Sequence, residues 1–201
     1  MGKCLVILSG GRDRYYVFFL LCFFSLFCSE PYQSLYNQAH LLEARWNYCH
    51  DGMQKMISCL VKAQVICPQI KKEIKKLKGY SLTAFDTLGD VQQIYYRKAE
   101  KINNLHLAIN KTYEGARKEK ELFNEYLKNL QNGEYELQEG ERLLSEFQAK
   151  LKKYENKMIS YQRRLEQYAQ EHDQFIDSLK LRFSNFNGDK IKCDIKPFHS
   201  I

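Results

Sequence analysis

Cysteine is the residue type in this chain whose number and spacing could do chemistry. Of the seven cysteines, four follow the apolar N-terminal segment, an even number that is typical of disulfides in an exported chain. These four are Cys49, Cys59, Cys67 and Cys193. On one continuous helix the first three lie ~12 Å or more apart, beyond the ~7 Å that a disulfide allows. We therefore expect Cys193, in the C-terminal tail, to pair with Cys67; the alternative is that Cys49 and Cys67 are small apolar core residues.

Metal, cofactor and catalytic chemistry are not predicted. No two cysteines have the C-x-x-C spacing of a zinc site, and Cys49 and His50 point ~100° apart on a helix. His172 occupies a core position alone, which is typical of a structural histidine. No glycine-rich loop follows a strand, so nucleotide binding has no support. We expect no enzyme, no cofactor and no small-molecule substrate.

Five lysines gather in the segment from residue 71 to 78. They are Lys71, Lys72, Lys75, Lys76 and Lys78. At the C-terminal end of a helix such a cluster opposes the negative pole of the helix dipole, which is one interpretation. The functional interpretation is a basic contact patch for an acidic partner or an anionic membrane surface.

One sequon for N-glycosylation is present. Asn110-Lys111-Thr112 has the N-x-T pattern, which makes Asn110 a candidate glycosylation site in a secreted eukaryotic protein.

The N-terminus predicts export. Residues 15–28 form an apolar run behind Lys3, Arg12 and Arg14, and the run is shorter than the ~20 residues of a membrane-spanning helix. We assign residues 1–29 to a signal peptide cleaved near Ser29 or, because Phe27 and Cys28 are poor cleavage-site residues, to an uncleaved signal anchor. The protein is then secreted, periplasmic or membrane-anchored.

The next residues repeat apolar side chains in steps of four and three, which predicts a helix over 31–78 packed along its whole length. Every position of this seam is apolar: Leu35, Ala39, Leu42, Trp46, Cys49, Met53, Met56, Leu60, Ala63, Cys67, Ile70, Ile74 and Leu77. Pro68 removes a backbone donor, so we expect a kink or a restart of the helix there.

A second seam keeps one phase from Leu88 to Leu179 and fails at Gly133 and Gly140. Asn132-Gly133 is a strong turn dipeptide, which favours two helices, over 84–131 and 134–181, with Phe123 beside Arg142 or Leu144 and Ile109 beside Tyr154 or Met158. The alternative is one continuous helix that dimerises as a parallel coiled coil.

The predicted fold is all-α: an elongated antiparallel three-helix bundle, or a coiled-coil hairpin, over residues 30–181. Residues 182–201 form a C-terminal tail in which Asn187-Gly188-Asp189 precedes alternating apolar and polar residues, which predicts a short β-like hairpin.

The net charge of +7 is too small an excess to predict nucleic-acid binding. We expect an exported, non-enzymatic structural or interaction protein that binds a protein partner, or a second copy of itself, along its coiled-coil surface. In size, basicity, export signal and coiled-coil content only, the chain resembles the small trimeric chaperones of bacterial outer-membrane assembly. That resemblance implies the alternative function, a periplasmic holdase-like chaperone, which needs a cavity between the arms of a trimer.

Overall fold

Three long helices make up the protein. The computed structural model describes residues 13–77 and 85–191, with side chains described for 30–77 and 92–191. The helices are α1 (Asp13–Lys76), α2 (Phe85–Gln131) and α3 (Leu137–Arg182). No strand occurs in this described part. The protein is therefore all-helical, as predicted.

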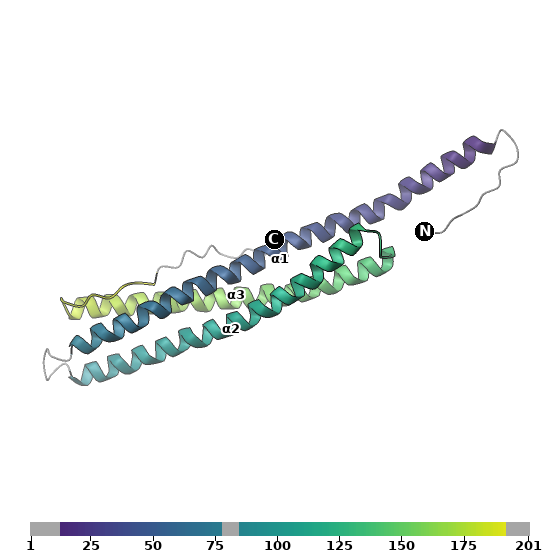
Figure 1. Cartoon of the computed structure of the whole chain (residues 1–201). Helices are drawn as coiled ribbons and strands as arrows, with labels where there is room; N and C mark the ends of the chain where they lie inside the picture. Colours follow the sequence, from purple (N-terminus) through teal and green to yellow (C-terminus); the bar gives the residue numbers. More distant parts are fainter. Residues whose placement is uncertain (1–12, 78–84, 192–201) are drawn as a thin grey trace.

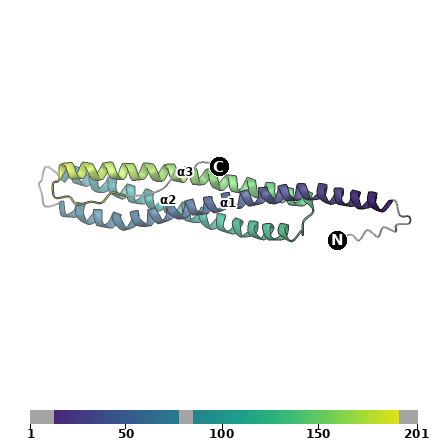
Figure 2. The same cartoon turned by 90° about the horizontal axis from the view of Figure 1, so that it is seen from above.

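The helices lie side by side in an elongated bundle in which each contacts the other two (Figures 1 and 2). Contacts at both ends show that α2 and α3 are antiparallel. Near their connection the Tyr126 hydroxyl donates to the Gly140 carbonyl at 2.9 Å, and near the opposite end Lys98 Nζ lies 3.3 Å from Glu171 Oε2. The connection between α2 and α3 is therefore a hairpin. α1 runs parallel to α3 and antiparallel to α2 (Figure 1).

The predicted seam of α1 is buried in full. Trp46 is 1% exposed, and the other seam residues from Leu35 to Leu77 are buried with it. Fully burying one large apolar side chain contributes ~1.5–3 kcal/mol, so this continuous row is the main source of stability along the rod. Because α2 and α3 of the same chain cover it, the seam of α1 is not left open for a partner.

The hairpin between α2 and α3 lies at the predicted dipeptide. α2 ends at Gln131, and Gly133 adopts φ +69°, a left-handed conformation that is costly for a residue with a Cβ. The Gly133 N–H donates to the Leu130 carbonyl at 3.1 Å, which closes the end of α2. α3 then begins at Leu137. The single continuous helix is therefore not the structure of this segment.

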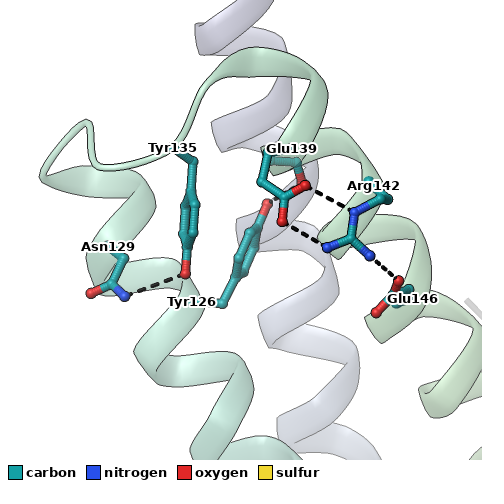
Figure 3. Close-up of polar contacts among 7 residues, drawn as sticks. Tyr126, Asn129, Tyr135, Glu139, Arg142 and Glu146 are labelled. Atoms are coloured by element: carbon teal, nitrogen blue, oxygen red, sulfur yellow. Dashed lines mark hydrogen bonds and ion pairs between the residues drawn. The ribbon is translucent and has the colours of Figure 1, made fainter.

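Gly140 marks a close approach rather than a break in the helix. A Cβ at this position would lie 2.8 Å from Leu35 Cδ2 of α1, so a larger residue would require the Leu35 side chain to shift. Its carbonyl accepts the Tyr126 hydroxyl at 2.9 Å, and Figure 3 shows Tyr126 reaching toward the first turn of α3 with Tyr135 alongside it. The hairpin is thus held by ring stacking and a buried hydrogen bond.

The register of the hairpin differs from the predicted one by about one helical turn. Phe123 packs against Phe147, with ring centroids 5.2 Å apart, three residues beyond the predicted neighbour Leu144. Similarly, the Tyr161 hydroxyl lies 2.9 Å from Thr112 Oγ1. The cause is the longer connection, because α3 starts at Leu137 instead of residue 134. Each α2 residue therefore contacts an α3 residue that lies later in the sequence than predicted.

α1 is continuous through both of its prolines, Pro31 and Pro68. The predicted restart at Pro68 is therefore wrong. A proline in a helix removes the hydrogen bond of one N–H and crowds one carbonyl, and here tertiary packing outweighs that cost: Cys67 and Ile70, on either side, are buried seam residues.

The tail folds back along α3 after Phe183, whose N–H donates to the Leu179 carbonyl at 2.9 Å. Phe186 and Ile191 are buried, and Lys190 Nζ lies 2.8 Å from Asp177 Oδ2. Residues 183–191 contain no strand. The rest of the predicted hairpin, from residue 192 on, lies outside the described residues.

The predicted export segment, residues 1–29, lies at the start of α1. Its first 12 residues and the side chains through Ser29 are outside the described residues. From Asp13 on, the backbone is one helix with the rest of α1, and this N-terminal part extends beyond the α2–α3 hairpin (Figures 1 and 2). Within the described residues, no helix is both long enough and apolar enough to cross a membrane.

Candidate functional site

The predicted lysine cluster at the end of α1 is partly neutralised by the protein itself. Lys71 Nζ lies 4.6 Å from the centre of the Tyr96 ring, a cation–π contact between α1 and α2. Lys76 pairs with Glu73 at 2.5 Å. Lys72 and Lys75 are exposed, and Lys78 lies outside the described residues. Two of the described lysines are thus available for an outside contact.

The threonine of the sequon is part of the α2–α3 interface. Asn110 Nδ2 is 3.0 Å from His106 Nε2, and Thr112 is buried with its hydroxyl 2.9 Å from the Ala108 carbonyl and from the Tyr161 hydroxyl. The Thr112 side chain, which the glycosylating enzyme must recognise, is therefore inside the folded bundle. Glycosylation at Asn110 stays a prediction, and it would have to precede folding.

The structure corrects the predicted disulfide. Cys67 has a free, buried thiol, so the predicted Cys67–Cys193 bond is not formed, and Cys193 lies outside the described residues. Cys67 occupies the seam of α1, where burial raises the pKa of its thiol and the Tyr95 hydroxyl bonds its carbonyl at 2.7 Å. Cys49 is free as well, and burial raises its pKa to about 12. Both thiols stay protonated at neutral pH, as small core residues. The described cysteine that is disulfide-bonded is Cys59.

A pocket of about 340 Å³ opens between α1 and α2 beside Pro68. Its rim includes Lys71 and Tyr96, which contact each other, and Tyr95, whose hydroxyl is engaged by the Cys67 carbonyl. The polar groups that could orient a ligand are therefore already used within the protein.

His172 is a buried histidine at the end of the bundle where the tail folds back. It is 1% exposed, and its Nε2 lies 3.2 Å from the Asp189 carbonyl. Burial lowers the pKa of the imidazole, partly offset by the Asp189 carbonyl and by the Asp173 carboxylate. A neutral histidine bonded to the tail is a structural residue, in agreement with its sequence interpretation.

Glu155 is the buried charge that sequence reasoning missed. Its side chain is 2% exposed and receives the Arg45 guanidinium from α1 at 2.8 Å. Glu155 was not singled out from the sequence. However, Glu155 lies four residues after Leu151 and three before Met158, the same spacing that marks a core position.

One face of α3 carries unpaired cations, which sequence reasoning also missed. We call this the α3 basic face: Lys152, Lys153, Lys157, Arg163 and Arg164. All five are exposed, they span ~18 Å of helix, and none forms an ion pair with a described residue. The one acid between Leu151 and Leu165 is Glu155, whose charge is directed inward to Arg45. Between Leu151 and Leu165 the exposed charges are therefore all positive.

Two exposed arginines elsewhere on the bundle differ in this respect. Arg142 pairs with Glu139 and Glu146 of its own helix (Figure 3), and Arg117 pairs with Glu114 and Glu121 in the same manner. Such pairs a turn apart neutralise a helix surface. The charge run K-K-Y-E-N-K followed by R-R was the signal that could have located the α3 basic face.

The described residues contain no group of histidine, cysteine and acidic side chains that could hold a metal ion. Fold and site thus define an elongated three-helix bundle whose α3 basic face carries five exposed cations outside any ion pair with a described residue. Comparisons with protein-family models, with curated proteins and with solved structures found no match.

Proposed function

We propose that this is an exported, non-enzymatic helical protein that binds an acidic protein partner through the α3 basic face. The carrying observation is that the five cations of this face share one exposed surface and form no ion pair with a described residue. Clustered, unpaired charge of one sign raises the local concentration of an oppositely charged partner and speeds association. A rigid helix also holds the cations at fixed spacing, which limits the entropy lost on binding.

A protein partner fits the geometry better than an anionic membrane surface. The α3 basic face lies beside Arg45, which contacts Glu155. Arg45 is ~26 Å along α1 from Cys28, the end of the apolar run. If that run sits in a bilayer with α1 upright, the cations stand about three Debye lengths from the lipid headgroups, since the Debye length is ~8 Å in physiological salt. In addition, no large exposed apolar side chain of α3 accompanies the face to insert into lipid.

The test compares two variants that lose the same charge. In the first, Lys152, Lys153 and Lys157 are changed to Gln; in the control, the exposed α1 lysines Lys55, Lys62 and Lys72 are changed to Gln. Binding of the full chain to poly-L-glutamate is measured by fluorescence anisotropy in low salt. We expect the first variant to lose about tenfold in affinity, equivalent to ~1.4 kcal/mol, and the control to change by about twofold or less.

Equal losses in the two variants would show that net charge alone matters and would overturn the proposal. Vesicles containing phosphatidylserine form a parallel arm of the experiment. Tighter binding to these vesicles than to poly-L-glutamate, with the same dependence on the three α3 lysines, would assign the face to a membrane instead.

The holdase-like chaperone is the second candidate. It requires apolar surface in a cavity between subunits, whereas the seam of α1 is buried within one chain, which favours the first candidate. The native mass distinguishes them: a stable trimer that suppresses aggregation of an unfolded protein would support the chaperone.

Export is part of the proposal and is supported by the apolar run at residues 15–28. N-terminal sequencing of the protein from its own host is expected to begin between residues 26 and 33 after cleavage. An intact Met1 in the membrane fraction would indicate the anchor, and an intact Met1 in a soluble cytosolic fraction would contradict export.

A further inference from the structure

We infer that Cys59 forms its disulfide with Cys193 and that this bond fastens the C-terminal tail to α1. The inference starts from the state of the three described cysteine side chains. Cys59 is 5% exposed and disulfide-bonded, while Cys49 and Cys67 are free. The partner of Cys59 is therefore one of the other four cysteines of the chain.

The geometry of α1 excludes the three N-terminal cysteines. Cys22 and Cys28 lie on the same continuous helix as Cys59, at ~55 and ~46 Å from it, against a limit of ~7 Å between the Cα atoms of a disulfide. Cys4 precedes Asp13, which is ~69 Å from Cys59, and the intervening nine residues reach at most ~32 Å when fully extended. Within one chain, Cys193 is the cysteine that remains.

The described part of the tail brings the chain toward Cys59. Lys190 pairs with Asp177, and the Ile191 N–H donates to Asp173 Oδ1 at 3.2 Å. The tail therefore runs back along α3 toward its N-terminus. Two residues separate Ile191 from Cys193, which allows ~7 Å of extended chain.

The position of Cys59 along the length of the bundle lies within the distance that the tail can span. α1 and α3 are parallel, and a Cβ on Gly52 would meet Met158 Sδ at 2.7 Å, so Cys59 is level with about Leu165. The axial gap from Asp173 to that level is ~12 Å. Two extended residues and the ~5.5–6 Å between the Cα atoms of a disulfide cover it.

The chemistry balances with a disulfide oxidant. Two thiols lose two protons and two electrons as the S–S bond forms, and an oxidised dithiol of the acceptor is reduced to two thiols. Such a bond persists in an oxidising compartment and is reduced in the cytosol. The inference thus rests on the proposed export for its persistence in the cell, but not for the choice of partner.

The test is peptide mapping of the full chain without reduction, after refolding in a glutathione redox buffer and blocking of free thiols with iodoacetamide. We expect one linked peptide pair containing residues 59 and 193 that disappears on reduction. Cys193→Ser is expected to leave Cys59 open to alkylation. The matched control Cys67→Ser is expected to keep the linked pair, because Cys67 takes no part in it.

A linkage of Cys59 to any other residue, or to Cys59 of a second chain, would overturn the inference. So would a Cys193→Ser variant in which Cys59 stays protected. Alkylation of protein from its own host separates the two proposals: a pair that forms in glutathione buffer but is reduced in the host contradicts export and leaves the pairing intact.

Discussion

Arg45 of α1 donates to both carboxylate oxygens of Glu155 of α3, with Nη2 at 2.9 Å from Oε1 and 2.8 Å from Oε2. The two partners differ in burial, since the Arg45 side chain is 29% exposed and the Glu155 side chain 2%. The desolvation cost of the pair therefore falls on the carboxylate, which depends on the guanidinium for compensation. This contact links the two parallel helices and directs the one acid between Leu151 and Leu165 away from the α3 basic face.

Removing Arg45 alone is expected to be strongly destabilising. Arg45→Met leaves Glu155 charged and buried without a partner, which lowers the free energy of unfolding by ~3–5 kcal/mol. Urea denaturation followed by circular dichroism measures the change. The double variant Arg45→Met, Glu155→Leu is expected to recover most of it, whereas the control Arg142→Met, at an exposed pair, is expected to change stability much less. A loss below ~1 kcal/mol for Arg45→Met would mean that water reaches Glu155 in solution.

His172 is expected to make the protein less stable in mild acid. Burial lowers the pKa of this imidazole in the folded state, so the unfolded chain binds more protons as the pH falls through ~6.5, the ordinary value for histidine. Stability therefore rises with pH across this window and is lost below it. The groups facing the ring are the Asp189 carbonyl, the Asp173 carboxylate and Lys98.

The measurement is the difference in unfolding free energy between pH 7.5 and 5.5 in the native sequence and in His172→Gln. The variant is expected to show a smaller difference. An exposed-histidine control is His40→Gln, since His40 is not buried. Equal pH dependence in the native sequence and in His172→Gln would show that other groups cause the effect.

The buried face of α1 could be predicted from sequence because every fourth and third residue from Leu35 to Leu77 is apolar. The turn at Gly133 could be predicted as well, because a local dipeptide specifies it. The register of the hairpin depends on the number of residues in the connection, and the sequence pattern does not specify where α3 begins. Phe123 therefore lies against Phe147, about one turn from its predicted neighbours.

Glu155 and Cys59 show why the candidate site could be predicted only in part. A buried carboxylate is favourable only when its partner is in place, and Arg45 is far away in sequence. Cys59 is 5% exposed, whereas the sequence favoured Cys67 as the cysteine nearest the end of the first helix. Both cases depend on which helices become neighbours, which is a tertiary property.

Gly133 is expected to tolerate asparagine better than alanine. Its φ of +69° places an L side chain in the left-handed region, at a cost of ~1–2 kcal/mol. No atom lies within 4 Å of a Cβ built there, so the cost is conformational and not steric. Gly133→Ala is expected to lower the unfolding free energy by ~1 kcal/mol, and Gly133→Asn by less. Equal losses for the two variants would point to a contact of the side chain instead.

Thr112 is expected to contribute stability through its hydroxyl, apart from any role in the sequon. Oγ1 donates to the Ala108 carbonyl at 2.9 Å and lies 2.9 Å from the Tyr161 hydroxyl, joining α2 to α3 at a buried position. Thr112→Val keeps the shape and removes these bonds, and is expected to cost ~1–2 kcal/mol because polar groups of the interface lose a partner. Thr112→Ser keeps the hydroxyl and is expected to cost less.

Protein produced in bacteria separates this effect from glycosylation, since the sequon is then unmodified. Asn110→Gln is the matched control, because it destroys the sequon and leaves the Thr112 hydroxyl in place. Urea denaturation is expected to rank Thr112→Val as the least stable of the three variants. If Asn110→Gln costs as much as Thr112→Val, the Asn110 contact with His106 is as important as the Thr112–Tyr161 bond, and the interface depends on the whole polar cluster of α2. If Thr112→Val costs nothing, water replaces the lost bonds, and this part of the bundle is open to solvent.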